Sequence, residues 1–136
     1  MYALQVYLYA AALLLTASGA AYAARASQMI GAALENARWM EGLPTASTEF
    51  AIYNIRTLGI QYLVMGFLLA ACGALGDRPV LLAAAHAAML WSAGQLTVPA
   101  TFLSKDRARK RRTVHRIIVS FGLICAYFLP PMLSTS

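Results

Sequence analysis

The fold is decided by residues 50–76, FAIYNIRTLGIQYLVMGFLLAACGALG, in which Arg56 is the only charged residue. The hydrocarbon core of a bilayer is about 30 Å thick, and an α-helix crosses it with about 20 predominantly apolar residues. The whole chain is 60% hydrophobic and only 12% charged, whereas about a quarter of the residues of soluble domains are charged. This stretch therefore predicts a membrane-spanning helix.

Three further apolar stretches accompany it, at residues 1–24, 79–103 and 114–133. Four such stretches, separated by short polar breaks, predict an all-α fold: a four-transmembrane-helix bundle that forms one integral membrane domain over residues 1–136. The last stretch contains Pro130 and Pro131. Because consecutive prolines exclude helical geometry from the first of the pair, the fourth helix should end near Leu129.

The first stretch can also be interpreted as a secretory signal peptide, because Ala21-Tyr22-Ala23 is an acceptable cleavage pattern. However, no Lys or Arg precedes the apolar run, and the run is longer than the apolar region of a typical signal peptide. We therefore expect the first helix to be retained.

The polar connections predict the topology. Seven of the eleven basic residues lie within residues 105–116, which we expect to form a basic loop. Residues 25–49 carry apolar side chains at helical spacing, which predicts either an interfacial amphipathic helix or an extension of the first span. Because basic loops stay in the cytoplasm, both connections should be cytoplasmic and both termini luminal or exterior.

A cluster of basic side chains beside a span attracts anionic lipid headgroups, at about 1 kcal/mol per residue. The alternative is that the cluster only fixes the orientation of the protein. Nucleic acid is not an expected partner, because no aromatic residues for base stacking are interleaved with the basic ones. The expected headgroup ligands are Lys105, Arg107, Arg109, Lys110, Arg111 and Arg112.

Small residues form a seam along the second span. Gly59, Gly66 and Gly73 repeat every seven residues, and Ala70 lies on the same helix face. In lipid, helices associate through close backbone contact at small residues. We therefore expect these four residues to pack against another helix, and the first span offers a matching face.

Polar residues lie on two sides of the second span. Arg56 shares the seam side, with Glu49 as its expected partner, while Asn54 and Gln61 lie on another face. Intramembrane polar groups usually have a function, although Arg56 could instead extend to the membrane interface. Polar groups on two faces indicate that this span is central or that it meets another subunit.

His86, in the third span, completes the residues that could contact a ligand. It cannot share a haem with His115, because the two histidines lie at different depths in the bundle. We find no metal-binding cluster, no cofactor-binding motif and no catalytic motif. The candidate ligand-binding residues are Glu49, Asn54, Arg56, Gln61 and His86.

Two short strings resemble the small four-helix ergosterol-biosynthesis scaffold family of the endoplasmic reticulum. They are Arg56-Thr57-Leu58-Gly59-Ile60 and Gln95-Leu96-Thr97-Val98, within a region of about fifty residues. The family has a His-Phe-x-Ser-Glu stretch where this chain reads Trp91-Ser92-Ala93-Gly94-Gln95. The resemblance implies a tether that gathers membrane enzymes. The outline also resembles other small four-span families, such as the DoxX-like proteins.

The sequence thus favours a non-catalytic scaffold, assembly factor or accessory subunit of a membrane complex. Its expected partners are membrane lipids and either other membrane proteins or further copies of itself. The alternative is a membrane-embedded enzyme or carrier for a small apolar molecule, such as a sterol, a quinone or another lipid. No cofactor is expected.

Overall fold

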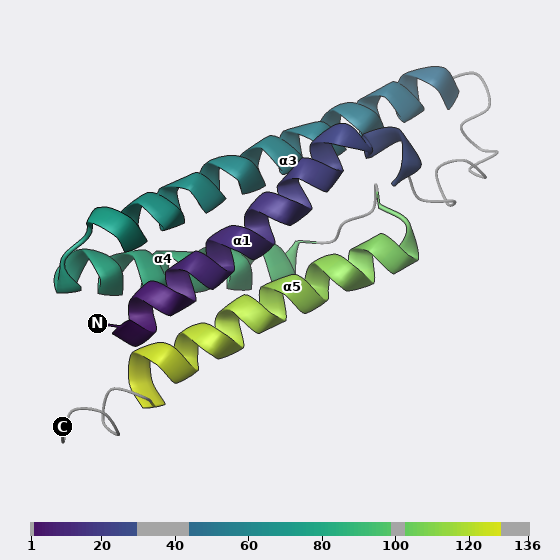
Figure 1. Cartoon of the computed structure of the whole chain (residues 1–136). Coiled ribbons are helices and arrows are strands. Elements are labelled where there is room, and N and C mark those ends of the chain that lie inside the picture. The colour runs from purple at the N-terminus through teal and green to yellow at the C-terminus, as the bar shows by residue number, and fades with distance from the viewer. Residues whose placement is uncertain (1, 30–43, 99–102, 129–136) are drawn as a thin grey trace.

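The computed structural model describes residues 2–29, 44–98 and 103–128, which form a bundle of antiparallel helices (Figure 1). Every long element in the described part of the chain is an α-helix, as the apolar stretches predict. An all-α bundle is therefore confirmed. Its elements are α1 (Tyr2–Ala24), the 3-10 turn η1 (Ala26–Gln28), α3 (Pro44–Leu75), α4 (Arg78–Thr97), α5 (Lys105–Leu123) and the π-helical turn η3 (Ile124–Phe128).

Three of these helices are long and apolar enough to cross a membrane. The qualifying segments are Ala3–Ala24, Glu49–Leu75 and Arg78–Thr97. They correspond to the first three predicted spans, and α3 begins earlier than the sequence indicated. The fourth predicted span, 114–133, is shown only as a helical segment that begins at Lys105, and residues 129–136 lie outside the described part of the chain.

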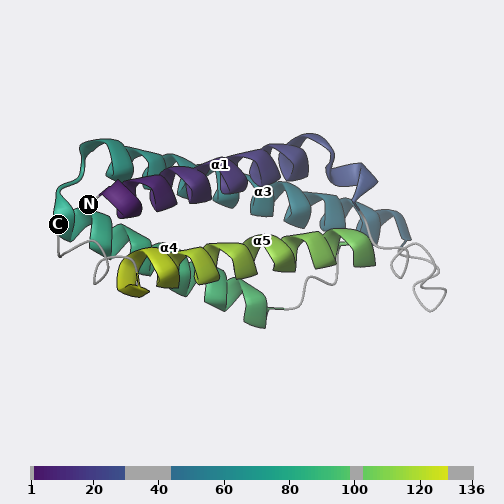
Figure 2. The same cartoon turned by 60° about the horizontal axis from the view of Figure 1, so that its bottom comes forward.

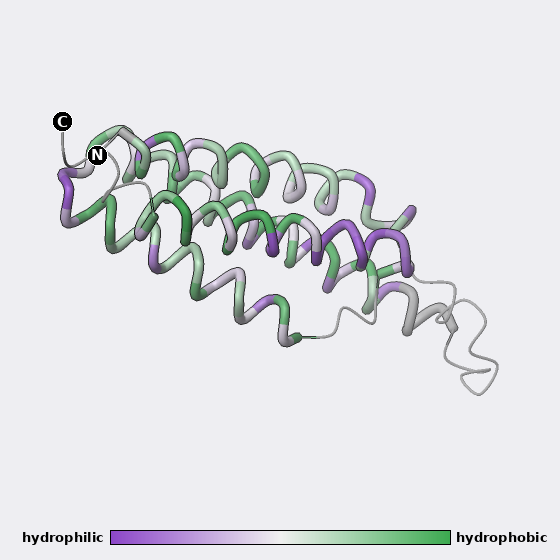
Figure 3. Tube along the Cα trace, turned by 90° about the horizontal axis from the view of Figure 1, so that it is seen from below, coloured by the Kyte–Doolittle hydropathy of each residue, from purple (hydrophilic) through white to green (hydrophobic). Residues whose placement is uncertain are grey.

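The prediction of a basic loop at residues 105–116 is wrong, because this segment forms the first turns of α5. The Ser104 hydroxyl accepts a hydrogen bond from a backbone N–H of the first turn, which caps the helix. Asp106 forms ion pairs with Arg109 (3.0 Å) and Lys110 (3.2 Å) at helical spacing. Lys and Arg also have high helix propensity. Figure 3 shows the resulting polar helix end in purple.

Hydrogen bonds fix the chain at both ends of the bundle. Between α3 and α4, Gly76 ends the first helix and the Asp77 carboxylate accepts a hydrogen bond from Val80 N at 3.3 Å, with Pro79 in the first turn. At the opposite end, Ser104 N donates to Met29 O at 3.0 Å, so the start of α5 is tied to the end of η1. Most of the predicted amphipathic segment, residues 30–43, lies outside the described residues.

The helices associate as two pairs, α1 with α3 and α4 with α5 (Figure 2). The start of α1 and the end of η3 lie at one end of the bundle, and the basic start of α5 lies at the other end (Figure 1). Buried side chains from both pairs meet between them, including Tyr7, Tyr62 and Leu81. The basic start of α5 therefore lies at the end of the bundle opposite the α3–α4 turn, where Asp77 and Arg78 are exposed.

Glycines bring α1 and α3 into close contact. A Cβ atom added to Gly59 would lie 2.7 Å from backbone atoms of both Gly19 and Ala23, closer than real Cβ contacts. A Cβ on Gly66 would lie 2.5 Å from Thr16 Oγ1. At the other end of this contact, the Gln5 amide donates to Gly73 O at 3.3 Å. The seam of glycines on α3 therefore faces α1.

Gly59→Ala is expected to destabilise the protein by about 1 to 3 kcal/mol, because the new methyl group must push two helix backbones apart. Gly94→Ala is the matched control, since a Cβ at Gly94 meets nothing within 4 Å and alanine favours helix over glycine. Thermal unfolding in detergent should show a lower midpoint for Gly59→Ala only. Equal midpoints for the two variants would contradict this packing.

Candidate functional site

A cluster of buried polar side chains joins three helices near the basic end of the bundle. Its centre is the hydroxyl of Tyr62 on α3, which accepts a hydrogen bond from Arg111 Nε at 3.1 Å and is hydrogen bonded to His115 Nε2. Arg111 also donates to Gln95 Oε1 on α4. His115 Nδ1 lies 3.0 Å from Ser92 Oγ. The cluster therefore links α3, α4 and α5.

The chemistry of the donors fixes the direction of this chain of hydrogen bonds. A guanidinium can only donate, so the Tyr62 oxygen accepts from Arg111. The Tyr62 O–H is then available to donate to His115 Nε2. This leaves the other ring nitrogen of His115 to donate to Ser92 Oγ. With this assignment His115 is neutral, and each group has a suitable partner.

Aromatic rings surround the cluster. Tyr62 makes edge contacts with Tyr22 of α1 and with Trp91 of α4, at centroid separations of 5.4 Å and 5.1 Å. His115 contacts Trp91 in the same manner at 5.4 Å. Such edge-to-face pairs are favourable beyond their buried area. Through Tyr22, all four long helices contribute to the site.

Burial decides what this cluster can do. Ser92 and His115 are 0% exposed and Arg111 is 4% exposed. A Ser–His pair resembles part of a hydrolytic site, but here both side chains are buried and hydrogen bonded within the cluster. What the geometry shows is a link between three helices, and buried polar networks of this kind specify one packing of a bundle.

The prediction that Arg111 contacts lipid headgroups is wrong, because its guanidinium lies inside the bundle and binds Tyr62 and Gln95. The reason is helical periodicity. On α5, Arg111, His115 and Ile118 are buried at a spacing of three to four residues, and they form one face of the helix. Among the other predicted headgroup ligands, Arg107 is half-buried, whereas Lys105, Arg109, Lys110 and Arg112 are exposed.

The candidate ligand-binding residues do not gather into one site. Glu49, Arg56 and Gln61 are exposed. The Asn54 amide donates to Phe50 O within its own helix at 2.8 Å. Within the described part of the chain, the ion pairs all involve Asp106, so Glu49 and Arg56 are not paired with each other.

His86 lies apart from these residues, on α4 at the opposite end from the basic helix start. Its Nδ1 is hydrogen bonded to Leu82 O at 2.7 Å, and its Nε2 is hydrogen bonded to the Tyr127 hydroxyl of η3. The two rings also make an edge contact. His86 therefore joins η3 to α4, and both of its ring nitrogens have partners.

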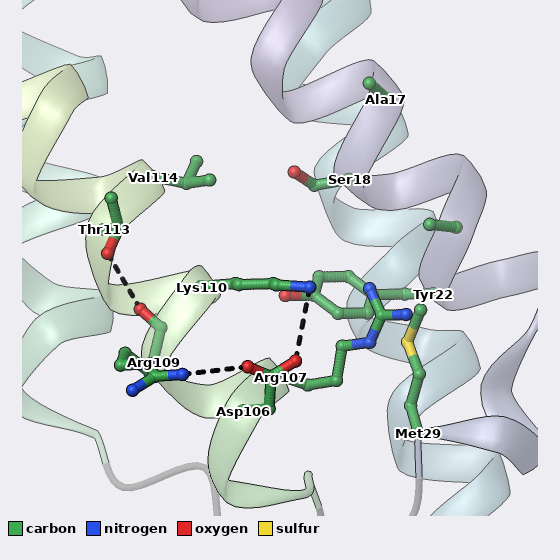
Figure 4. A pocket seen from close by; sticks show the side chains of 11 residues that line it. Ala17, Ser18, Tyr22, Met29, Asp106, Arg107, Arg109, Lys110, Thr113 and Val114 are labelled. Carbon is green, nitrogen blue, oxygen red and sulfur yellow. Dashed lines mark hydrogen bonds and ion pairs between the residues drawn. The ribbon is translucent and has the colours of Figure 1, made fainter.

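An open pocket of about 550 Å³ lies between α1 and α5 at the basic end of the bundle. Figure 4 shows the side chains of Arg107 and Lys110 extending from α5 toward Tyr22 on α1, with Met29 beside them. Asp106 lies at the rim, where hydrogen bonds from Lys110 and Arg109 lower the pKa of its carboxyl group. The pocket is thus lined by more cationic than anionic groups.

Sequence reasoning missed the buried cluster because its residues look ordinary one at a time. Tyr62 and Trp91 are typical apolar residues of a span, and Arg111 belongs to a run of basic residues. The available signal was the spacing of Arg111 and His115, which places both on one face of a helix. That signal has meaning only if residues 105–116 are helical.

Tyr62→Phe is expected to lower stability by about 1 to 3 kcal/mol, because Arg111 and His115 each lose a buried hydrogen-bond partner. The matched control is Tyr53→Phe on the same helix, since Tyr53 is 66% exposed and should tolerate the change. The midpoint of thermal unfolding in detergent measures the difference. If both variants unfold at the same temperature as the parent protein, the cluster does not stabilise the bundle.

Comparison with known proteins identifies no relative of this chain. No protein family, no curated protein and no solved structure matches it. The resemblance of two short strings to the ergosterol-biosynthesis scaffold family therefore stays a prediction. What the described residues do show is a helical bundle with three helices able to cross a membrane.

Proposed function

We propose that the protein is a non-catalytic accessory subunit or scaffold, which binds another membrane protein through the outer face of α3. The observation that carries this proposal is the exposed amide of Gln61 inside a candidate membrane span. Any window of about 20 residues within Glu49–Leu75 contains Gln61. However the helix is placed in the bilayer, this amide lies in the hydrocarbon region.

An amide in hydrocarbon is unfavourable unless it is hydrogen bonded. Within the described part of the chain, the Gln61 side chain makes no hydrogen bond, and it lies about 200° around the helix from Gly59, which faces α1. The bundle therefore does not supply a partner on that side. A polar side chain on a transmembrane helix of another protein would supply a hydrogen-bond partner for the Gln61 amide.

The surroundings of Gln61 fit a helix-binding face. Ile60, Val64 and Phe67 are exposed large side chains on the same side of α3, and Arg56 lies one turn closer to the basic end. The glycine seam is already covered by α1, so it is not the surface that holds the partner. We expect a partner helix with a hydrogen-bonding residue opposite Gln61 and an acidic residue near Arg56.

We further propose that the basic end of the bundle lies in the cytoplasm and that both termini face the lumen or exterior. Seven of the eleven basic residues belong to α5, and basic residues beside spans are retained in the cytoplasm. An odd number of crossings would place the termini on opposite sides. The proposal therefore requires the segment that contains α5 to cross the membrane as well.

Val64→Trp is expected to abolish the complex, because an indole at the centre of the outer face of α3 prevents a helix from approaching. Val64 is 54% exposed, so the bundle itself should tolerate the change. Leu90→Trp is the matched control on α4, where Leu90 is 74% exposed. Native mass spectrometry of the gently extracted protein should find the partner with Leu90→Trp and not with Val64→Trp.

Two results of that experiment would count against the proposal. If Val64→Trp and Leu90→Trp both keep the partner, the outer face of α3 is not the binding surface. If the extracted protein contains only further copies of this chain, the complex is a homo-oligomer and the partner is not a different protein.

Gln61→Leu is expected to weaken the complex about threefold, and at most about twentyfold, because hydrogen bonds between membrane helices contribute about 0.6 kcal/mol on average and up to about 1.7 kcal/mol. Gln61→Asn keeps an amide and should lose less. The fraction of protein found in the complex, measured over a dilution series, gives the change. A stronger complex with Gln61→Leu would show that the amide does not face the partner.

A further inference from the structure

Two pockets follow one another along the bundle between α1 and α5, and the two together are termed the groove. The first, at the basic end, is the pocket lined by Tyr22, Ala21 and Ala17 of α1. One helical turn farther along both helices, a second pocket of about 290 Å³ follows. Its lining is apolar: Tyr7, Ala10, Ala11, Leu13, Leu14, Ile117, Ile118 and Phe121.

The two ends of the groove differ in chemistry. Arg107, Arg109 and Lys110 line the first pocket together with the single carboxylate of Asp106, which gives three positive charges minus one, or a net charge of +2. Asp106 is engaged by Arg109 and Lys110. Among the described residues, Arg107 has no acidic partner, and its guanidinium extends across the pocket toward Tyr22 (Figure 4).

We propose that this groove is a binding site for one anionic phospholipid, with its phosphate on Arg107 and Lys110 and an acyl chain along the apolar part. A guanidinium binds phosphate through two parallel hydrogen bonds. The apolar pocket offers only carbon surface and accommodates a hydrocarbon chain. The cationic pocket and the apolar pocket thus lie next to each other, as the phosphate and the acyl chains of a phospholipid do.

The dimensions and the depth of the groove agree with this occupant. From Tyr22 to Tyr7, α1 rises about 22 Å, which matches the roughly 20 to 22 Å of one bilayer leaflet with its headgroup region. These residues belong to the candidate span Ala3–Ala24, so the groove runs along the direction of the acyl chains. A lipid can enter it from the side, without leaving the bilayer.

At each end of the groove, a hydrogen bond links the α1 side to the α5 side. At the apolar end, the Tyr7 hydroxyl donates to Ile118 O at 3.0 Å and ties α1 to α5. At the basic end, Ser104 N donates to Met29 O at 3.0 Å. Between these ties the two helices make few direct contacts compared with α1 and α3. These two hydrogen bonds therefore fix the positions of the α1 side and the α5 side of the groove relative to each other.

The first test uses the unaltered full chain in detergent, with native mass spectrometry to count bound lipids. Phosphatidylglycerol should remain bound as one molecule per chain, whereas phosphatidylcholine with the same acyl chains should be lost. Glycerol phosphate, which has the anionic group without acyl chains, should not bind. Equal retention of the two lipids would overturn the proposal, and so would binding of glycerol phosphate as tight as that of phosphatidylglycerol.

Variants then locate the lipid. Arg107→Gln should weaken phosphatidylglycerol binding about fivefold or more, since one basic contact is worth about that factor. Arg112→Gln removes the same charge from an exposed position outside the groove and should leave binding unchanged. If both variants lose affinity equally, the lipid responds only to total charge and the groove is not its site.

The apolar part needs its own variant. Ala10→Phe places a ring in the second pocket and should displace the acyl chain, with a loss of at least tenfold in affinity. Ala20→Phe is the matched control, because Ala20 is an exposed residue of α1 that does not line either pocket. Unchanged binding by a folded Ala10→Phe variant overturns the proposal. Far-ultraviolet circular dichroism establishes whether each variant is folded. If Ala10→Phe does not fold, the comparison of the two lipids on the unaltered chain still tests the proposal.

This site is independent of the surface proposed for the partner protein. The groove lies between α1 and α5, whereas Val64 is on the outer face of α3. Val64→Trp should therefore leave lipid binding unchanged, and Arg107→Gln should leave the protein complex intact. Failure of one proposal can thus be told apart from failure of the other.

Discussion

The arrangement of α3, α4 and α5 depends on the hydrogen bonds that the Tyr62 hydroxyl forms with Arg111 and His115. Arg111 carries a positive charge into the bundle, where a charge without hydrogen-bond partners is strongly unfavourable. Tyr62 and Gln95 provide acceptors for it, and Tyr62 is also hydrogen bonded to His115. Because these side chains come from three helices, any sliding or rotation of one helix breaks a buried hydrogen bond.

The packing of the helices also decides which faces of the bundle are covered and which stay accessible. α1 and α3 are joined by contacts at glycines that leave no room for side chains, so that side of α3 is fully used. On the opposite side of α3, no described residue forms a hydrogen bond with the Gln61 amide. The space between α1 and α5 holds a cationic pocket followed by an apolar one. One rigid framework thereby leaves two separate surfaces available, which we propose bind a protein helix and a lipid.

Much of the fold could be predicted from the sequence, but little of the buried cluster could. Long apolar runs and the turn at Asp77 specify where the first three candidate spans occur, because length and hydropathy are local properties. The high charge of residues 105–116 suggests a loop, but Ser104 and Asp106 favour the start of a helix, which is what the structure has. The sequence predicts that Arg56 and Glu49 pair at the seam, whereas both are exposed.

By itself, the sequence determined that the chain forms apolar helices, where the turn between the second and third helices lies, and which residues are small enough for close packing. These properties follow from the composition and spacing within single segments. Only the tertiary structure decided that Arg111 is buried, that His115 meets Tyr62, and that Arg107 faces a groove. Those outcomes depend on which helices are neighbours and how each is rotated about its axis, and residues far apart in the chain set both.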